Sequence, residues 1–236
     1  MNKKNSELKF DRETLVSAIR NTRAKLQDMI MYNDFFAKLK FEQTAYLPYK
    51  KDNNPPETNF IEFLNQLFTS LASLMADEYI KYKYIKYNKG SEWEAKYAIG
   101  EKNGRDINWN SNDKNIIAEV FAATKTSSNN KLKEDIKALC APKKNDGNVI
   151  QRYVFFILAQ NEFEKLDNSK GVKKFQSMTN YCSKSGVKIT AQSEISGDDN
   201  IKNWQCEYLY DKNAENVTIV CFSQKYAQEF LNNICK

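Results

Sequence analysis

The sequence predicts an α/β protein in which helices flank a central mixed β-sheet, preceded by an N-terminal helical segment. Helical and strand-like apolar patterns alternate along the 236 residues, and two strand-like segments, 116–123 and 149–159, are predominantly apolar on both faces. Strands coated on both faces belong in the middle of a sheet that helices cover on both sides. We therefore expect a helical segment at 1–57 and an α/β domain at 58–236, with its core at 58–160 and a C-terminal extension at 161–236.

The first half of the chain predicts two helices. From about residue 11 to residue 40, apolar side chains recur at helical spacing, which indicates a long amphipathic helix, and the proline-rich segment 46–56 is a loop. A second helix begins at Asn59, because Glu62 three residues later forms a capping box with it. Segment 79–87 (YIKYKYIKY) either continues this helix or forms a strand, and its alternation of apolar and Lys residues favours a strand.

A hairpin with one acidic residue on each strand follows. If the turn is Ser111–Lys114, antiparallel pairing places Asp106 directly opposite Glu119, with Cβ atoms roughly 5 Å apart on one face. Glu119 lies in a strand that is apolar on both faces, so it must be buried and paired. Two facing carboxylates in such a setting require a divalent cation or a shared proton. The alternative for Asp106 is an ordinary residue at a turn or strand end.

The remaining elements complete an alternating α/β pattern. Residues 126–129 can cap a short helix around 132–139, and the apolar strand 149–159 follows it. A strand, a helix and a strand in succession imply a right-handed crossover. Beyond them the sequence predicts a helix near 172–184, strands near 187–194, 204–210 and 217–222, and a terminal helix capped by Ser223.

Composition excludes several classes of catalytic site. The chain has no histidine, which removes Ser-His-Asp and Cys-His nucleophile systems and His-ligated zinc. Its five cysteines are widely spaced, without a Cys-x-x-Cys pair, so we expect buried free thiols: Cys140, Cys182, Cys206, Cys221 and Cys235. Carboxylates, lysines, tyrosines and metals remain, and carboxylate sites select hard cations such as Mg²⁺.

Charge and hydropathy bear on partners and location. The formal net charge of +6 is compatible with a polyanionic partner without demanding one. No run of eighteen apolar residues occurs, and charged sequence follows the N-terminus in place of a signal-peptide core. We expect a soluble cytoplasmic protein that binds neither a membrane nor an organic cofactor.

The order of these elements resembles the core of the PD-(D/E)XK nuclease superfamily, which includes many type II restriction endonucleases. The resemblance covers roughly residues 58–160. It rests on the order helix with Glu62, strand, strand with Asp106, strand with Glu119, helix and strand, and on the segments Gly104–Ile107, Ile116–Val120 and Lys131–Ile136.

The resemblance implies a restriction-endonuclease-like fold and a Mg²⁺-dependent deoxyribonuclease, a homodimer that cuts both strands of double-stranded DNA. Asp106 and Glu119 would hold one or two Mg²⁺ ions, and Glu62 would be a further catalytic acid. The capping box with Asn59 explains Glu62 equally well without a metal. In the family, a lysine two residues after the Glu helps to position or activate the attacking water.

This sequence departs from the family pattern at that lysine, because position 121 is Phe. A phenylalanine cannot hydrogen-bond a nucleophilic water. Lys125 shares the strand face of Glu119, but six residues of strand place it roughly 20 Å away. We therefore prefer Lys131, one turn into the following helix, as the catalytic lysine.

The expected contacts to DNA are Lys81, Lys83, Arg105 and Lys125. The first two alternate with tyrosines, a pattern that can follow a phosphate backbone and stack bases. A half-buried strand with lysines on its wet side explains the same pattern. Two other interpretations of the whole chain stay open. One is a catalytically inactive module of the same fold that binds nucleic acid or protein, and the other is an unrelated α/β protein whose hairpin acids cap a helix or form ion pairs.

Overall fold

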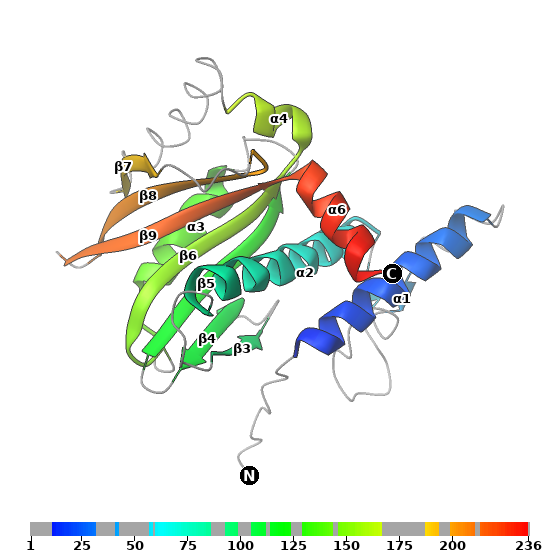
Figure 1. The fold of residues 1–236 in the computed structure, drawn as a ribbon, viewed down its shortest axis with the longest axis horizontal. Helices are drawn as coiled ribbons and strands as arrows, with labels where there is room; N and C mark the ends of the chain where they lie inside the picture. Colours follow the sequence, from blue (N-terminus) through cyan, green and yellow to red (C-terminus); the bar gives the residue numbers. More distant parts are fainter. Residues whose placement is uncertain are drawn as a thin grey trace, which may run out of the picture.

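The structure is a computed structural model that describes residues 11–31, 41–42, 57–58, 60–85, 93–98, 105–111, 114–123, 129–143, 146–166, 187–193, 199–210 and 213–235. Figure 1 shows the elements in order along the chain. The first half contains α1 (Arg12–Met31), β1 (Phe41–Glu42), β2 (Glu57–Thr58), α2 (Phe60–Ile80), the π-helical turn η2 (Lys81–Ile85), β3 (Glu94–Tyr97), β4 (Ile107–Ser111) and β5 (Lys114–Ala123). The second half contains α3 (Asn129–Cys140), β6 (Val149–Leu158), α4 (Gln160–Glu164), β7 (Val187–Ser193), β8 (Ile201–Tyr210), β9 (Asn213–Ser223) and α6 (Gln224–Ile234).

A mixed β-sheet organises the described residues. Its seven strands lie in the order β3-β4-β5-β6-β9-β8-β7. The two outer groups pair in antiparallel fashion, whereas β5, β6 and β9 run parallel in the centre. A parallel neighbour requires a crossover connection, and α3 provides it between β5 and β6. The predicted α/β class with a mixed sheet is therefore confirmed.

Helices cover both faces of the central strands (Figure 1). Ile116, Ala118 and Val120 of β5 lie in the same buried cluster as α2 residues such as Leu71 and Met75. Alternate residues of β5 point the other way and pack with α3, and these include Ile117 and Phe121, which contact a cluster containing Leu132, Ile136 and Leu139. The two-sided apolar pattern of β5 thus reflects two separate cores, and the prediction of a central strand is confirmed.

The register of the β4–β5 hairpin agrees with the prediction from the turn. Ser111 pairs with Lys114 and Ile107 pairs with Ala118. Continuing this ladder by one step brings Asp106 opposite Glu119. The short connection sets this register. A slip of one residue would also turn each side chain of β5 to the opposite face of the sheet.

The prediction of a strand at 79–87 is wrong for residues 79–85, the part of this segment that the structure describes. Tyr79 and Ile80 are the last residues of α2, and Lys81–Ile85 form η2. Ile80 is buried in the α2 cluster, and the Lys81 ammonium pairs with the carboxylate of Asp77 one turn earlier at 2.7 Å. Packing of the helix on the sheet therefore overrides the alternating pattern that favoured a strand.

The first and the last described helices, α1 and α6, pack on the same α2 side. Leu15 and Ile19 of α1 belong to the cluster that contains α2, and the Arg20 Nε donates to the Ile234 carbonyl at 2.7 Å. Figure 1 accordingly places the C-terminus beside α1. Ser223 caps α6 as predicted, since its hydroxyl accepts a hydrogen bond from the Tyr226 N–H at 3.0 Å.

Some predictions lie outside the described residues. These are the continuation of the first helix over 32–40, the helix near 172–184 and the thiol of Cys182. Of the cysteines that the structure describes, none is in a disulfide; Cys140, Cys206 and Cys221 are buried and Cys235 is partly exposed. None of the described helices has the length and apolar character needed to cross a lipid bilayer.

Candidate functional site

Asp106 lies where the β4–β5 ladder ends. The ladder stops at the Ile107–Ala118 pair, and the next free N–H of β5, on Val120, donates to the Asp106 Oδ2 at 2.7 Å. The Asp106 carbonyl also accepts from the Ala98 N–H at 3.0 Å. The side chain thus takes the place of a backbone partner, and this contact holds the carboxylate over the middle of β5.

Glu119 faces the same point from β5. It is 8% exposed and lies on the α3 side of the sheet. Its carboxyl group lies close enough to that of Asp106 for the two to share a hydrogen bond when one of them is protonated. Since ionised carboxylates only accept hydrogen bonds, such a contact requires one proton between the two groups. The expectation that Glu119 is buried and paired is confirmed.

The pKa values of both acids are raised. Burial raises the pKa of Glu119 most, the negative charges of Asp106 and Asp135 add to it, and the result is about 8. Burial also raises the pKa of Asp106, against the hydrogen bond from Val120 and the charge of Lys131. In neutral solution without a cation, the pair therefore retains a proton.

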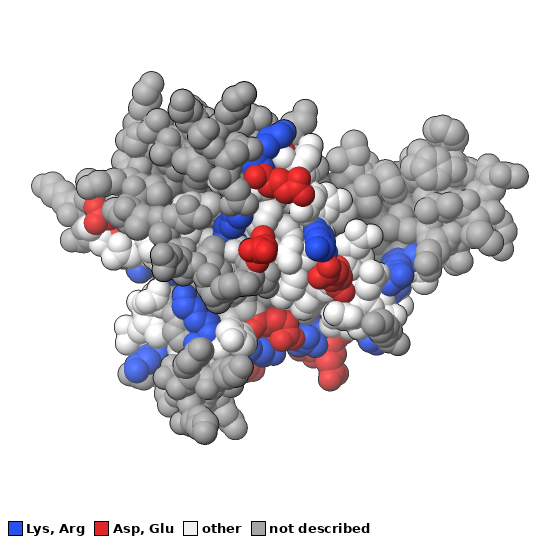
Figure 2. Space-filling view, turned by 45° about the horizontal axis from the view of Figure 1, so that its top comes forward, with Lys and Arg blue, Asp and Glu red and all other residues white. Residues whose placement is uncertain are grey.

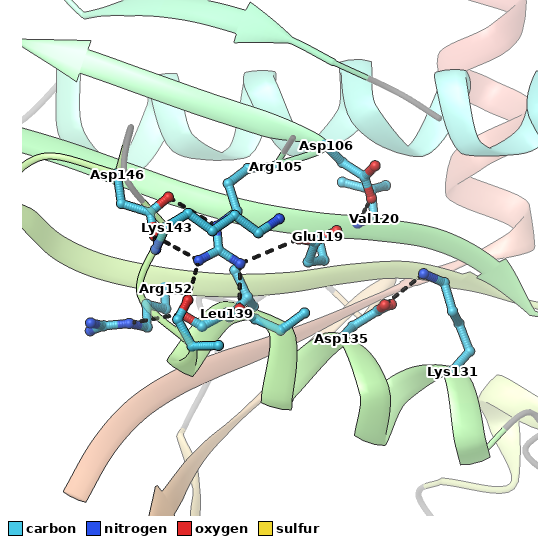
Figure 3. Close-up of polar contacts among 12 residues, drawn as sticks. Arg105, Asp106, Glu119, Val120, Lys131, Asp135, Leu139, Lys143, Asp146 and Arg152 are labelled. Carbon is cyan, nitrogen blue, oxygen red and sulfur yellow. Dashed lines mark hydrogen bonds and ion pairs between the residues drawn. The ribbon is translucent and has the colours of Figure 1, made fainter. Parts of the chain in front are cut away.

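Arg105 anchors this region from inside the protein. It is 5% exposed, and its guanidinium forms a bidentate pair with Asp146, with Nε–Oδ1 at 3.1 Å and Nη2–Oδ2 at 2.6 Å (Figure 3). It also donates to the carbonyls of Ala138 and Ala141 at the end of α3. Its Nη1 lies 3.7 Å from the Glu119 Oε1. Arg105, predicted as a contact to DNA, thus joins α3 and the loop before β6 to the acidic pair.

Asp146 carries a negative charge at this anchor. Burial alone would raise the pKa of Asp146, but the hydrogen bonds from Arg105 and from the Lys143 N–H outweigh burial, so the pKa is lowered. A charge-assisted bidentate pair of this kind is strong and directional.

Helix α3 brings Lys131 and Asp135 to the other side of the pair. The Lys131 Nζ lies 2.6 Å from the Asp135 Oδ1, and Figure 3 shows both side chains on the side of α3 that faces β5. Burial raises the pKa of Asp135 to about 6, against the charge of Lys131. Burial alone would lower the pKa of Lys131, but the charges of Asp135, Asp106 and Glu119 outweigh it and raise that pKa.

Lys143 is a residue that the sequence analysis missed. Its side chain lies beside Arg105 in Figure 3, and its charge lowers the pKa of both Asp106 and Glu119. Burial and the neighbouring charge of Arg105 lower the pKa of Lys143 itself. No motif signals Lys143, because it lies in the loop after α3 and approaches the acids only through the parallel crossover.

Phe121 cannot take part in the chemistry. It is 6% exposed, and its ring stacks on Phe156 with centroids 5.1 Å apart and planes 4° from parallel. The side chain two residues after Glu119 is therefore part of the core beneath α3.

The remaining predicted residues are not brought to this site by any described contact. Lys81 pairs with Asp77, and the Lys83 ammonium lies 5.7 and 5.6 Å from the ring centroids of Tyr79 and Tyr153. Both lysines belong to η2 at the end of α2, which covers the sheet face opposite to α3. Glu62 lies in α2, but its side chain is outside the described residues, as is all of Lys125.

The donor set fits a hard cation. Within the part of the chain that the structure describes, no three Asp, Glu, Cys or His side chains are close enough to hold one ion together. Mg²⁺ does not need three, because it keeps several waters and takes one or two carboxylates together with substrate phosphates. Asp106 and Glu119 are such a pair, and a cation would replace the proton that they hold.

Charges are balanced around the pair. Asp106, Glu119, Asp135 and Asp146 face Arg105, Lys131 and Lys143, and one shared proton makes the described site neutral. Exchange of that proton for a divalent cation would leave a net positive site, which favours a phosphate. On the face shown in Figure 2, the described Lys and Arg side chains are interspersed with Asp and Glu and form no continuous basic patch.

Comparisons with protein-family models, with curated proteins and with solved structures found no match for this chain.

Proposed function

We propose that this protein is a Mg²⁺-dependent deoxyribonuclease similar to type II restriction endonucleases, which hydrolyses phosphodiester bonds of double-stranded DNA as a homodimer. The observation that carries the proposal is the contact between the carboxyl groups of Asp106, which directly precedes β4, and Glu119 of β5. Two carboxyl groups held together, one buried and one half-buried, destabilise a fold, so a function explains the pair better than stability does.

The order of elements around the pair supports the proposal. Helix α2, three antiparallel strands β3 to β5, helix α3 and the parallel strand β6 follow one another in the order that the family resemblance implies. Asp106 directly precedes the second of these strands and Glu119 lies in the third, which are the positions of the metal ligands in that family.

The chemistry divides among named residues. Asp106 and Glu119 would hold Mg²⁺, which when bound supplies charge compensation at the phosphate and a more acidic water. Lys131 is our candidate for the lysine that the family places at position 121, because its charge already acts on both acids. Lys143 would offer a second positive charge for the phosphate. Arg105, whose Nη1 is 3.7 Å from the Glu119 Oε1, would orient the Glu119 carboxyl group.

An inactive module on the same fold is the second candidate. Two observations favour it: Phe121 is packed in the core where the family has a lysine, and the Arg105 Nη1 is 3.7 Å from the Glu119 Oε1. A guanidinium so close to a metal ligand opposes a cation by charge repulsion. Such a module would bind nucleic acid or protein without cutting.

A plasmid cleavage assay separates the two. The purified protein is incubated with supercoiled DNA and Mg²⁺ or Mn²⁺, and nicked and linear products are quantified. We expect cutting that Glu119→Ala abolishes and Glu134→Gln retains, because Glu134 lies on α3 with an exposed side chain paired to Lys137. No cutting with either metal, together with tight and salt-sensitive DNA binding, would support the module instead.

A further inference from the structure

Asp135 of α3 is the buried acid of the site that the family resemblance does not explain. The residue is 3% exposed, and its Oδ1 is 2.6 Å from the Lys131 ammonium. Its Oδ2 is buried and has no hydrogen-bond partner among the described protein atoms. Buried carboxylate oxygens are nearly always satisfied, so this atom requires an explanation.

Structural needs do not account for this oxygen. If the Asp135 Oδ2 had only a structural role, a protein N–H or O–H group would be expected to donate a hydrogen bond to it. A neutral side chain at position 135 could also pair with Lys131 at a lower desolvation cost. The charge of Asp135 raises the pKa of Glu119 and the charge of Asp106 raises that of Asp135, so the three carboxyl groups are near neighbours. Figure 3 shows Asp135 and Lys131 on the side of α3 that faces those acids.

We infer that Asp135 is a positioning residue of the metal site, whose Oδ2 accepts a hydrogen bond from a water bound to the cation held by Asp106 and Glu119. A water on Mg²⁺ uses its lone pair for the metal and directs both hydrogens outward, so it needs acceptors around it. Asp135 supplies one such acceptor, and Lys131 fixes the carboxylate by holding Oδ1. Asp135 does not bind the metal directly, since no three acids of the described residues converge on one ion.

This inference rests on the proposed metal site and deepens it. Groups that hold the ligands or waters of a metal typically change its affinity by about 10–100-fold when they are mutated. Asp135→Asn keeps the size of the side chain and leaves an oxygen for Lys131, but it replaces the free acceptor with an NH₂ donor. An NH₂ group cannot accept a hydrogen bond from a metal-bound water, so we expect Mn²⁺ affinity to fall by about 10-fold or more.

The experiment is a Mn²⁺ titration followed by electron paramagnetic resonance, with the intact protein and no DNA. Wild type, Asp135→Asn, Lys131→Met and Glu119→Gln are compared at one pH. Glu134→Gln is the matched control, because it removes one negative charge from the same helix at an exposed side chain. Thermal denaturation of each variant verifies that it is folded.

The outcomes distinguish this inference from the proposed function. The inference is supported if Asp135→Asn weakens Mn²⁺ binding at least about 10-fold, Glu134→Gln binds as tightly as wild type, and Lys131→Met, which only frees Oδ1, loses less affinity than Asp135→Asn. Wild-type affinity in Asp135→Asn overturns the inference alone, provided that Glu119→Gln loses the ion. Equal weakening in Lys131→Met also overturns it, because Asp135 would then act only through Lys131. Absence of Mn²⁺ binding to wild type overturns both proposals.

A second measurement needs no variant and covers the case in which Asp135→Asn fails to fold. In a crystal structure of the wild-type protein with Mn²⁺, the Asp135 Oδ2 should lie within hydrogen-bond distance of a water on the ion. An Oδ2 bonded only to protein atoms, or coordinated to the Mn²⁺ itself, would contradict the inference.

Discussion

Buried acids lie on both faces of the central sheet, and their surroundings differ. On the α2 side, Asp77 is fully buried and has cationic and neutral partners: the Lys81 ammonium at 2.7 Å, the Arg12 Nε at 3.7 Å and the Trp109 indole N–H at 2.9 Å. On the α3 side, Glu119 and Asp106 lie against each other, and although the Arg105 Nη1 is 3.7 Å from the Glu119 Oε1, Glu119 has a pKa of about 8.

The difference teaches which acids the fold itself uses. Asp77 links α1, α2 and β4 through opposite charges and a donor, as expected of a structural residue. The acids that α3 covers repel each other. Their raised pKa values mean that ionisation of these acids destabilises the native state. A site that is expensive to ionise without a cation is the better candidate for function.

The largest expected effect comes from Glu119→Gln. As a metal ligand, Glu119 should be needed for cleavage, so we expect a loss of at least about 100-fold in the rate of DNA cutting. The same change should stabilise the metal-free protein at pH 8 by on the order of 1 kcal/mol or more, because a neutral amide replaces an acid that resists ionisation. Cleavage rates and urea denaturation measure the two effects. A variant that is both active and less stable would contradict the comparison.

Phe121→Lys tests whether the family lysine can be restored at its usual position. Phe121 stacks on Phe156 in the core under α3, so the substitution removes aromatic packing and buries an ammonium. We expect destabilisation by about 3 kcal/mol or more and no gain in cleavage. Phe121→Leu is the control for packing alone. Faster cleavage by the lysine variant would instead show that the strand position is accessible to the site.

Asp77→Ala should affect only stability. It leaves the buried Trp109 indole N–H without its partner and removes the carboxylate shared by Arg12 and Lys81. We expect a loss of about 1–3 kcal/mol in the free energy of unfolding, with unchanged Mn²⁺ affinity. Chemical denaturation and Mn²⁺ titration of the same preparation test this. Weaker Mn²⁺ binding would mean that the two buried sites are coupled through the sheet.

The smallest change that we expect per unit of the variable is in the pH dependence of the free energy of unfolding of the metal-free protein. Below its ordinary pKa of 4.5, Glu119 holds a proton in both folded and unfolded states, whereas between 4.5 and about 8 only the folded state retains it. Stability should therefore fall as pH rises through this window, by at most about 1.4 kcal/mol per pH unit for this one group. Saturating Mg²⁺ should oppose the fall, and Glu119→Gln should flatten it. Denaturation series from pH 5 to 8, with and without Mg²⁺, measure both.

Local patterns in the sequence predicted much of this architecture. Three features could be predicted because they depend on residues close in the chain or on the two-residue period of a strand. They are the apolar strands β5 and β6, the register of the hairpin and the Ser223 cap. The same reasoning failed at 79–87, because the alternation there cannot reveal that α2 continues across the sheet and buries Ile80. Packing decided between two structures that the local pattern permits.

The sequence by itself determined the acidic pair, since a short hairpin with Asp and Glu at matching distances from its turn brings them face to face. Only the tertiary structure decided what surrounds the pair. Arg105 pairs with Asp146 and contacts the end of α3, Asp135 keeps one buried oxygen without a hydrogen-bond partner, and Lys143 approaches from the loop before β6. These contacts join residues separated by a parallel crossover, and no local periodicity records the position to which a crossover returns the chain.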